Sequence, residues 1–212
     1  MLENKPLYQD NSKNSVFSAI LGAIAIILMI FLAINLIINN IFCYKIVVNG
    51  ASMEPTFYSN EVVLASKNAR PDYGSVIIIT GEKSNGDWLI KRAIGFGGDT
   101  VKIEGGYVYL KKAGEEEFSK LNEPYLREEG ITFYPDVNRR SDTEKAEFTI
   151  EEGQVFYLGD NRTNSSDSRS QFSTCKESQV VGVVTDFAIK IKGITTFFEN
   201  ITLPIKKLLR TA

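Results

Sequence analysis

The chain has 212 residues, with 24 Lys and Arg against 26 Asp and Glu, two Cys and no His. The lack of His excludes Ser-His-Asp and Cys-His catalysis and any His-ligated metal, while two Cys are too few for a structural zinc site with four ligands. A net charge of −2 differs from the strongly basic footprint of nucleic-acid-binding proteins, so we expect no nucleic-acid partner. Cys43 and Cys175 allow at most one disulfide, which excludes a disulfide scaffold.

An uncharged apolar run covers residues 16–38, with Ser18 and Asn35 as its only polar side chains. A helix needs about 20 such residues to cross the hydrocarbon core of a bilayer. A cleaved signal peptide is the alternative, but its apolar region is shorter, about 7–15 residues, and small residues follow it. Here the bulky Ile41 and Phe42 follow the run. We therefore predict a retained transmembrane helix at residues 16–38.

The basic residues around this helix indicate its orientation. Lys5 and Lys13 precede the span, and Lys45 is the only basic residue soon after it. By the positive-inside rule, residues 1–15 are expected in the cytoplasm and the rest of the chain outside it.

Residues 41–192 are predicted to form one mainly β domain. Short runs rich in β-branched and aromatic residues are separated by Gly, Asp and Asn clusters, as in sandwiches and barrels. The predicted strands are Tyr44–Val48, Glu61–Ala65, Ser75–Thr80, Trp88–Ile94, Thr100–Glu104, Tyr107–Leu110, Gln154–Leu158 and Val180–Ile191.

Two stretches depart from the strand pattern. Residues 111–152 are rich in Glu, Lys and Arg and are predicted to be a small lobe inserted in the β domain. The tail, residues 193–212, carries Lys206, Lys207 and Arg210 among apolar residues. This pattern fits either a short amphipathic helix lying on a membrane or a frayed C-terminus.

Without His, a neutral Lys is the candidate base for a nucleophile, because burial lowers the pKa of a Lys and leaves its amine free to take a proton. Ser52 lies in a Gly- and Pro-containing loop directly after a predicted strand. Lys91 lies in an otherwise apolar strand beside Arg92, and alternation places these two side chains on opposite faces. Residues 159–169 contain no apolar side chain and follow a strand directly, as in the wall of a site.

Each of these features also has an ordinary structural explanation. A Ser in a loop is usually a turn residue, a Lys in a strand often extends along the surface, and a polar loop is usually only solvated. Their combination, in this order and behind a membrane helix, is far more specific than any one of them.

This combination resembles type I signal peptidases, membrane-bound Ser/Lys endopeptidases that remove signal peptides from exported proteins. The matching blocks are the membrane helix, Ser52-Met53-x-Pro55, Lys91-Arg92, and the stretch from Gly159-Asp160-Asn161 to Ser166-Asp167-Ser168-Arg169. The single span and short domain resemble the Gram-positive form of the family. The resemblance implies a β-barrel or β-ribbon catalytic domain with a small inserted lobe.

The resemblance also implies roles for individual residues. Ser52 corresponds to the nucleophile, Lys91 to the general base and Ser165 to the hydroxyl that orients the Lys amine. Structural ion pairs are implied for the charged residues Arg92, Asp160, Asp167 and Arg169. Some members take a second oxyanion donor from a hydroxyl two residues before the nucleophile, where this chain has Gly50.

Specificity for small residues, the Ala-x-Ala pattern of the family, is expected from shallow apolar pockets beside an added substrate strand. The positions that line these pockets in the family are Ile46, Val48, Met53, Phe57 and Ile90. The alternative is that these residues are ordinary core.

The function implied is signal-peptide removal, with secretory preproteins and the lipid bilayer as partners, no cofactor or metal, and a monomeric enzyme. Three other functions fit part of the pattern: a self-cleaving Ser/Lys repressor-type peptidase, an assembly factor for surface fibres, and a membrane-tethered β-rich binding module. The membrane helix disfavours the first, the presence of Ser52 and Lys91 disfavours the second, and the third leaves both residues unexplained.

Overall fold

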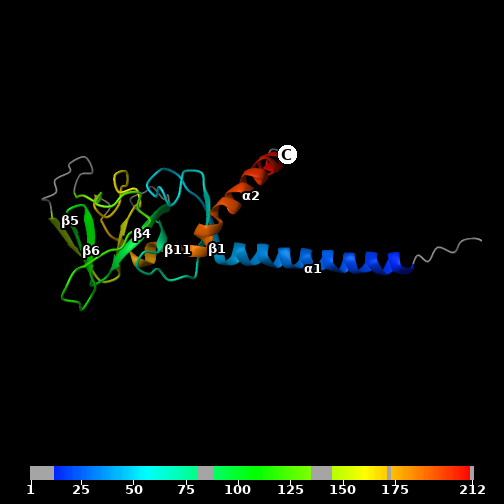
Figure 1. The fold of residues 1–212 in the computed structure, drawn as a ribbon, viewed down its shortest axis with the longest axis horizontal. Helices are drawn as coiled ribbons and strands as arrows, with labels where there is room; N and C mark the ends of the chain where they lie inside the picture. Colours follow the sequence, from blue (N-terminus) through cyan, green and yellow to red (C-terminus); the bar gives the residue numbers. More distant parts are fainter. Residues whose placement is uncertain (1–11, 81–87, 135–144, 171–172, 211–212) are drawn as a thin grey trace, which may run out of the picture. The chain divides into compact units, whose positions relative to one another are not determined.

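A computed structural model describes residues 12–80, 88–134, 145–170 and 173–210 (Figure 1). The chain divides into two compact units, Met1–Phe42 and Cys43–Ala212. The predicted N-terminal segment, residues 1–15, lies mostly outside the described residues.

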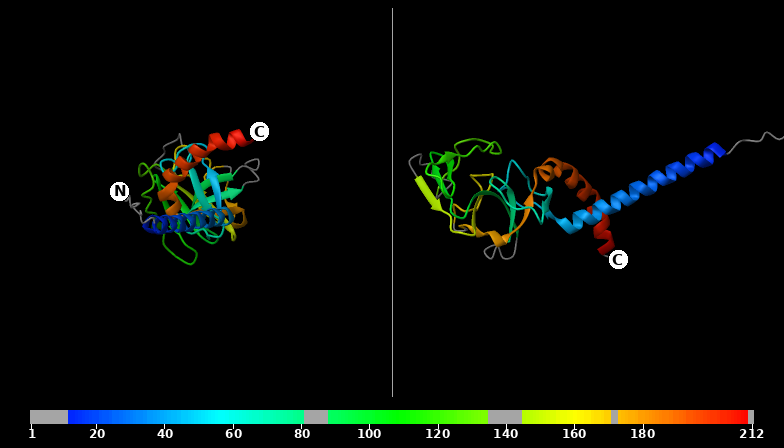
Figure 2. Two further views of the ribbon diagram at one scale, coloured as in Figure 1. Left: turned by 90° about the vertical axis from the view of Figure 1, so that its right-hand side faces the viewer. Right: turned by 90° about the horizontal axis from the view of Figure 1, so that it is seen from below.

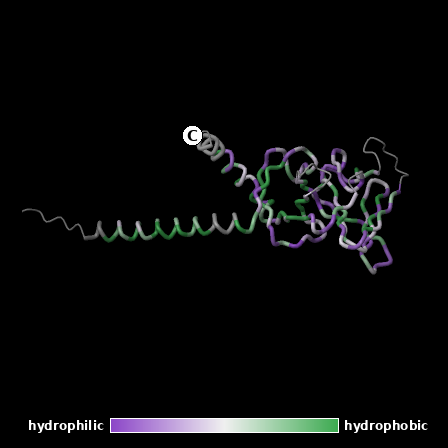
Figure 3. Tube along the Cα trace, turned by 180° about the vertical axis from the view of Figure 1, so that it is seen from behind, coloured by the Kyte–Doolittle hydropathy of each residue, from purple (hydrophilic) through white to green (hydrophobic). Residues whose placement is uncertain are grey.

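The first unit consists of one helix, α1, Ser12–Phe42, which extends beyond both ends of the predicted span. Among the described residues, Val16–Ile34 is the one helical segment long and apolar enough to cross a membrane. The side chains of this segment are exposed, and the hydropathy colours of Figure 3 mark most of its residues as hydrophobic. A helix that is apolar all round needs an apolar environment, which agrees with the predicted membrane anchor.

The second unit is mainly β, as predicted. Its strands are β1 Cys43–Val47, β2 Val62–Ser66, β3 Val76–Thr80, β4 Trp88–Phe96, β5 Thr100–Glu104, β6 Tyr107–Lys111, β7 Ser119–Lys120, β8 Lys145–Thr149, β9 Gln154–Leu158, β10 Cys175–Lys176 and β11 Val180–Val184. A 3₁₀ turn, η2, Glu177–Gln179, lies between β10 and β11. The sequence did not predict β7 and β10, which are too short to give a pattern, or β8, which lies in the charged stretch.

Seven strands form the larger sheet, in the order β1-β2-β11-β3-β4-β9-β10, with antiparallel pairing throughout. Figure 2 shows that this sheet is strongly curled. The neighbours Ile77 and Ile78 on β3 belong to different hydrophobic clusters, so both faces of the sheet are covered. This double burial explains why β3 reads as a continuous apolar run rather than an alternating one.

A second sheet, of order β7-β6-β5-β8, builds the smaller lobe. It begins at Thr100, whereas the sequence placed the start of the lobe at Lys111. The difference arises because β5 and β6 form an ordinary hairpin whose pattern does not reveal which sheet it joins. Apolar residues of this hairpin pack against Ile94 of β4 and Phe156 of β9 in a third cluster, which connects the two sheets.

The predicted strand Val180–Ile191 is wrong in its second half. β11 ends at Val184, and a helix, α2, runs from Asp186 to Arg210. The Thr185 hydroxyl accepts a hydrogen bond from the Ala188 N–H, which is the pattern of an N-cap, and Asp186 adds a negative charge to the first turn. The tail is therefore helical through Arg210, while its contact with a membrane stays a prediction.

One face of α2 is attached to the larger sheet. The Lys192 ammonium donates to the Thr56 carbonyl at 2.6 Å and to Glu61 Oε2 at 2.8 Å. Thr195 donates its hydroxyl proton to the Val62 carbonyl, and the Thr196 hydroxyl accepts the Val62 N–H. Further along the helix, Glu199 forms an ion pair with Lys45 of β1. The helix thus lies along β1 and β2.

We expect the cluster between the two sheets to be essential for stability. Phe156→Ala should lower the free energy of unfolding by about 3–5 kcal/mol, because Phe156 is fully buried and its removal leaves a cavity. Urea unfolding of the detergent-solubilised chain measures this. The control Tyr58→Ala removes a side chain that is 45% exposed, and it should change stability by no more than about 0.5 kcal/mol. Equal effects of the two changes would contradict this account of the core.

Candidate active site

Ser52 lies in the turn between β1 and β2. The turn begins at Gly50, whose φ of 91° belongs to the left-handed region that favours glycine. Backbone hydrogen bonds from the Glu54 N–H to the Ala51 carbonyl and from the Phe57 N–H to the Met53 carbonyl close it. Ser52 itself remains partly exposed. The turn is therefore rigidly held while its Ser stays accessible.

Lys91 lies on β4, between the neighbouring strands β3 and β9. Its Nζ donates a hydrogen bond to Ser52 Oγ at 2.6 Å. The residue is 4% exposed, and burial lowers the pKa of its ammonium to about 8, although the charges of Asp167 and Asp160 act in the opposite direction. A buried amine with this pKa is neutral in a substantial fraction of molecules at slightly alkaline pH, and it lies within proton-transfer distance of a hydroxyl.

Arg92, the next residue, has entirely different partners. Its guanidinium donates to both oxygens of Asp160, at 2.8 and 2.6 Å, and to the Gly74 carbonyl at 2.7 Å. The ring of Tyr125 lies 3.7 Å from the guanidinium carbon. The alternation of β4 thus directs Lys91 to Ser52 and Arg92 to a structural ion pair.

The second predicted ion pair lies within the polar loop of residues 159–169. Arg169 donates to both oxygens of Asp167 at 2.9 Å, and the Gly159 N–H donates to the same carboxylate. Burial raises the pKa of the Asp167 carboxyl, but the hydrogen bonds and charge of Arg169 outweigh this effect and hold the pKa below its usual value. Asp167 is thus a fixed anion in the loop.

The orienting role of Ser165 stays a prediction. Its Oγ is buried, and a hydrogen bond from it to the Lys91 amine is not among the contacts of the described residues. The hydroxyl instead lies against Gly159 and near Asp167, where it helps to lower the pKa of the Asp167 carboxyl. The Lys91 amine is directed towards Ser52 alone among the described side chains.

Gly159 and Asn161 hold the Ser52 turn in place, a role that the sequence did not assign to them. The Asn161 N–H donates to the Ser52 carbonyl, and its side-chain amide donates to the Ala51 carbonyl, both at 3.0 Å. A Cβ added at Gly159 would lie 2.5 Å from the Ser52 carbonyl oxygen, so only glycine permits this approach. The Gly-Asp-Asn motif was the available signal, but its contacts depend on tertiary structure.

Arg162 was also missed, although it is fully buried. Its guanidinium donates to Glu123, to the Thr132 hydroxyl at 2.6 Å and to the Gly159 carbonyl at 3.0 Å. Arg169 adds a bond to the Phe133 carbonyl. These bonds join the polar loop to residues 123–133 of the smaller lobe. In the sequence, Arg162 was one polar residue among many in its stretch.

The five predicted substrate-binding residues belong to one hydrophobic cluster. Val48, Met53, Phe57 and Ile90 are buried members, and Ile46 packs against them partly exposed. Met53 and Phe57 have no exposed surface, as expected of core residues. Their contact with a substrate stays a prediction.

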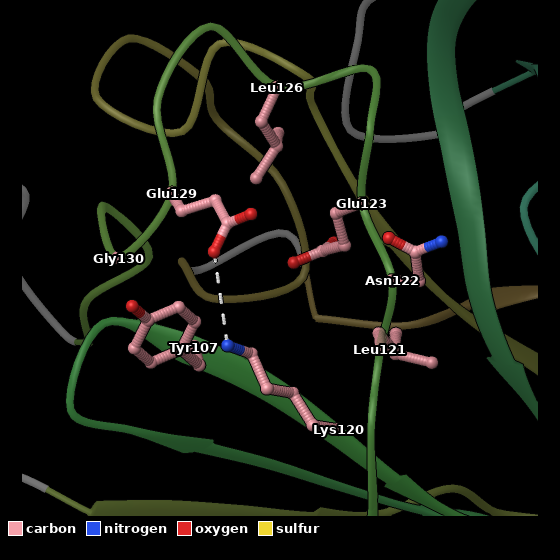
Figure 4. A pocket seen from close by; sticks show the side chains of 8 residues that line it. All are labelled: Tyr107, Lys120, Leu121, Asn122, Glu123, Leu126, Glu129 and Gly130. Carbon is pink, nitrogen blue, oxygen red and sulfur yellow. Dashed lines mark ion pairs between the residues drawn. The ribbon is translucent and has the colours of Figure 1, made fainter.

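A separate pocket of about 210 Å³ lies in the smaller lobe (Figure 4). It is lined by Tyr107, Lys120, Leu121, Asn122, Glu123, Leu126, Glu129 and Gly130. The close-up shows Lys120 and Glu129 facing each other across it. Lys120 Nζ lies 3.9 Å from Glu129 Oε2. Glu123 connects this pocket to the polar loop, because it is the partner of Arg162. Within the described part of the chain, no group of three or more Cys, Asp or Glu side chains could hold a metal ion.

A mainly β domain that pairs a serine hydroxyl with a buried lysine amine, behind an apolar helix, fits a membrane-bound hydrolase. The model of the family described as "Signal peptidase, peptidase S26" matches residues 20–188. The chain belongs to this family. The type of protein that the sequence motifs indicated is thereby confirmed.

Curated relatives carry corresponding names. The chain is 30% identical to a signal peptidase I of Bacillus amyloliquefaciens over 82% of this chain and 90% of that protein. It is 31% identical to signal peptidase I U of Bacillus subtilis (strain 168), over 68% of this chain and 75% of the relative. A signal peptidase I structure from Enterococcus faecalis V583 is 28% identical, with a TM-score of 0.42 over 55% of this chain and 98% of that chain. The family and the two curated relatives from Bacillus together make this chain a signal-peptide-processing enzyme.

The contact between lobe and loop can be tested through Arg162. Glu123→Ala should lower the free energy of unfolding by about 3–5 kcal/mol, because it leaves a fully buried guanidinium without its counter-ion. Denaturant unfolding in detergent checks this. Glu129→Ala, which removes a carboxylate that is 79% exposed, is the matched control and should have almost no effect. Combining Glu123→Gln with Arg162→Met should restore much of the lost free energy of unfolding. If Glu123→Ala lowers nothing and the double variant recovers nothing, the role of the ion pair is refuted.

Proposed function

We propose that this chain is a membrane-anchored serine endopeptidase that cuts signal peptides from exported preproteins with Ser52 as nucleophile and Lys91 as general base. The observation that carries the proposal is the 2.6 Å contact between Lys91 Nζ and Ser52 Oγ, together with burial that lowers the pKa of the amine to about 8. Nucleophilic Ser needs an adjacent base, and a desolvated Lys can serve as one. The alternative role as a fibre assembly factor without catalysis has no supporting contact.

In the proposed mechanism, the neutral Lys91 amine takes the proton of Ser52 Oγ as this oxygen attacks the carbonyl carbon before the scissile bond. The resulting ammonium gives its proton to the leaving amine, and an acyl-enzyme forms on Ser52. The amine then takes a proton from a water molecule as this water attacks the acyl carbon, and the ammonium returns the proton to Ser52 Oγ as the ester bond breaks. The Ser52 backbone N–H is the proposed oxyanion donor, and Gly50 contributes no side-chain donor. Every proton passes through Lys91, so no metal or cofactor enters the cycle.

The substrate is proposed to bind beside β1. This strand is the first in the sheet order, so its outer edge has no strand partner among the described residues. An extended signal peptide can add to such an edge through main-chain hydrogen bonds. Ile46 on β1 and the cluster behind it then favour small side chains, which gives the proposed Ala-x-Ala preference. The cytoplasmic N-terminus, the extracytoplasmic β domain and the monomeric state are parts of the same proposal.

Substitution of the dyad tests the roles of both residues. Ser52→Ala and Lys91→Ala should each lower kcat by about 10⁴-fold or more on a preprotein with an Ala-x-Ala site, because neither residue works without the other. Ser119→Ala and Lys112→Ala change exposed residues of the smaller lobe and should leave kcat unchanged. Cleavage that survives Lys91→Ala would show that the base is another group.

The pH profile tests the protonation state of Lys91. Its pKa of about 8 means that the ammonium predominates below pH 8. The rate should therefore fall about tenfold for each pH unit below 8 and level off above it. Measurement of kcat/KM between pH 5 and 9, with unfolding followed in parallel, separates loss of the base from loss of the fold. A flat profile across this range would exclude a Lys base.

A further inference from the structure

One face of the helix α2 is attached to the β domain. Lys192, Thr195, Thr196 and Glu199 attach the helix to β1 and β2. These four positions follow the i, i+3, i+4, i+7 spacing of a single helix face. The attachment therefore accounts for this face of α2 alone.

The other face presents apolar side chains to the outside. Ile194, Phe197, Phe198 and Ile201 are 59%, 60%, 61% and 50% exposed. They repeat the same spacing, shifted by two residues, which is about half a turn round the helix. Phe187, which is 69% exposed, continues the stripe two turns earlier. Burying such an apolar stripe is favourable, so water is a poor partner for it.

We propose that this stripe, Ile194, Phe197, Phe198 and Ile201, inserts into the surface of the bilayer that α1 crosses, and that α2 is a second membrane contact of the enzyme. The first argument is chain connectivity. The ion pair of Glu199 is with Lys45, three residues after the last residue of α1. α2 is thus held by the strand that leaves the membrane helix directly.

The second argument is charge. After Glu199 the sequence contains no acidic residue, whereas Lys206, Lys207 and Arg210 follow. The chain as a whole has a net charge of −2, so this concentration of positive charge is local. Interfacial helices combine Phe and Leu on one side with Lys and Arg, and they bind best to anionic lipids. The occupant that fits both the stripe and the charge is therefore an anionic lipid surface.

Membrane contact of α2 would also affect the position of Ser52 relative to the membrane surface. Lys192 of α2 bonds to the carbonyl of Thr56, in the turn that carries Ser52. A helix attached at once to this turn and to lipid would hold Ser52 at a fixed depth relative to the membrane surface. The inference itself requires only the membrane helix and holds whether or not the Ser/Lys mechanism is correct.

The test uses the full chain with a single tryptophan. Trp88→Phe removes the one native Trp. Two variants are made in this background. Phe197→Trp places the Trp on the stripe, and Asn200→Trp places it at an exposed polar position three residues further along the same helix. Both chains are reconstituted into vesicles of phosphatidylcholine and phosphatidylglycerol in equal parts, with and without brominated acyl chains. Thermal unfolding in detergent verifies that both variants fold.

The proposal predicts that the Trp of Phe197→Trp emits at shorter wavelength in vesicles than a Trp peptide control emits in detergent-free buffer. It also predicts that brominated lipids quench this Trp several-fold more than the Trp of Asn200→Trp. Vesicles without phosphatidylglycerol, or the added changes Lys206→Glu, Lys207→Glu and Arg210→Glu, should weaken this quenching. Equal and weak quenching at both positions would overturn the proposal. A blue shift without bromine quenching, growing with the number of chains per vesicle, would overturn it in favour of a second copy covering the stripe.

Discussion

Burial of the Lys91 amine beside Ser52 sets the condition that the rest of the β domain has to meet. Burial brings the pKa of the ammonium from 10.5 to about 8, which corresponds to roughly 3 kcal/mol against the charged form. Such a penalty is possible only where water is excluded and the backbone cannot shift. The placement of Lys91 on β4, hydrogen-bonded on both sides to β3 and β9, provides this rigidity.

Two buried carboxylates close to the amine would by themselves undo this effect. Asp160 and Asp167 both act to raise the pKa of Lys91, because a nearby anion favours the ammonium. Each is paired through two bonds with its own guanidinium, Asp160 with Arg92 and Asp167 with Arg169. These two pairs place a guanidinium beside each carboxylate, and burial remains the largest effect on the pKa of Lys91. They stabilise the loop around the site, while the pKa of Lys91 stays below its ordinary value.

The sequence predicted the parts of the molecule whose signals are local. Strands such as β3 and β9 are visible as short β-branched and aromatic runs, and Ser52, Lys91 and the two aspartates are visible through motifs. The helix α2 was misread because Phe187-Ala188-Ile189-Lys190-Ile191 alternates like a strand, while the signal that decides its structure is the cap at Thr185. Ser165 could not be placed, because the direction of a hydroxyl depends on packing against Gly159 and not on its position in a motif.

The most polar stretch of the sequence illustrates the limit of local reasoning. Residues 159–169 contain no apolar side chain, and composition alone indicates a solvated turn or the wall of a site. In the structure Asp160, Arg162, Asp167, Ser168 and Arg169 are nearly all inaccessible to water. Buried charges are tolerated only when they are paired and hydrogen-bonded. Here Asp167 and Arg169 pair within the loop, and the other partners come from β4, from the Ser52 turn and from the smaller lobe, all distant in sequence. The polar loop is therefore the point where these three parts of the domain are joined, and the lobe belongs to the structural support of the Ser52 site rather than being an appendage to it.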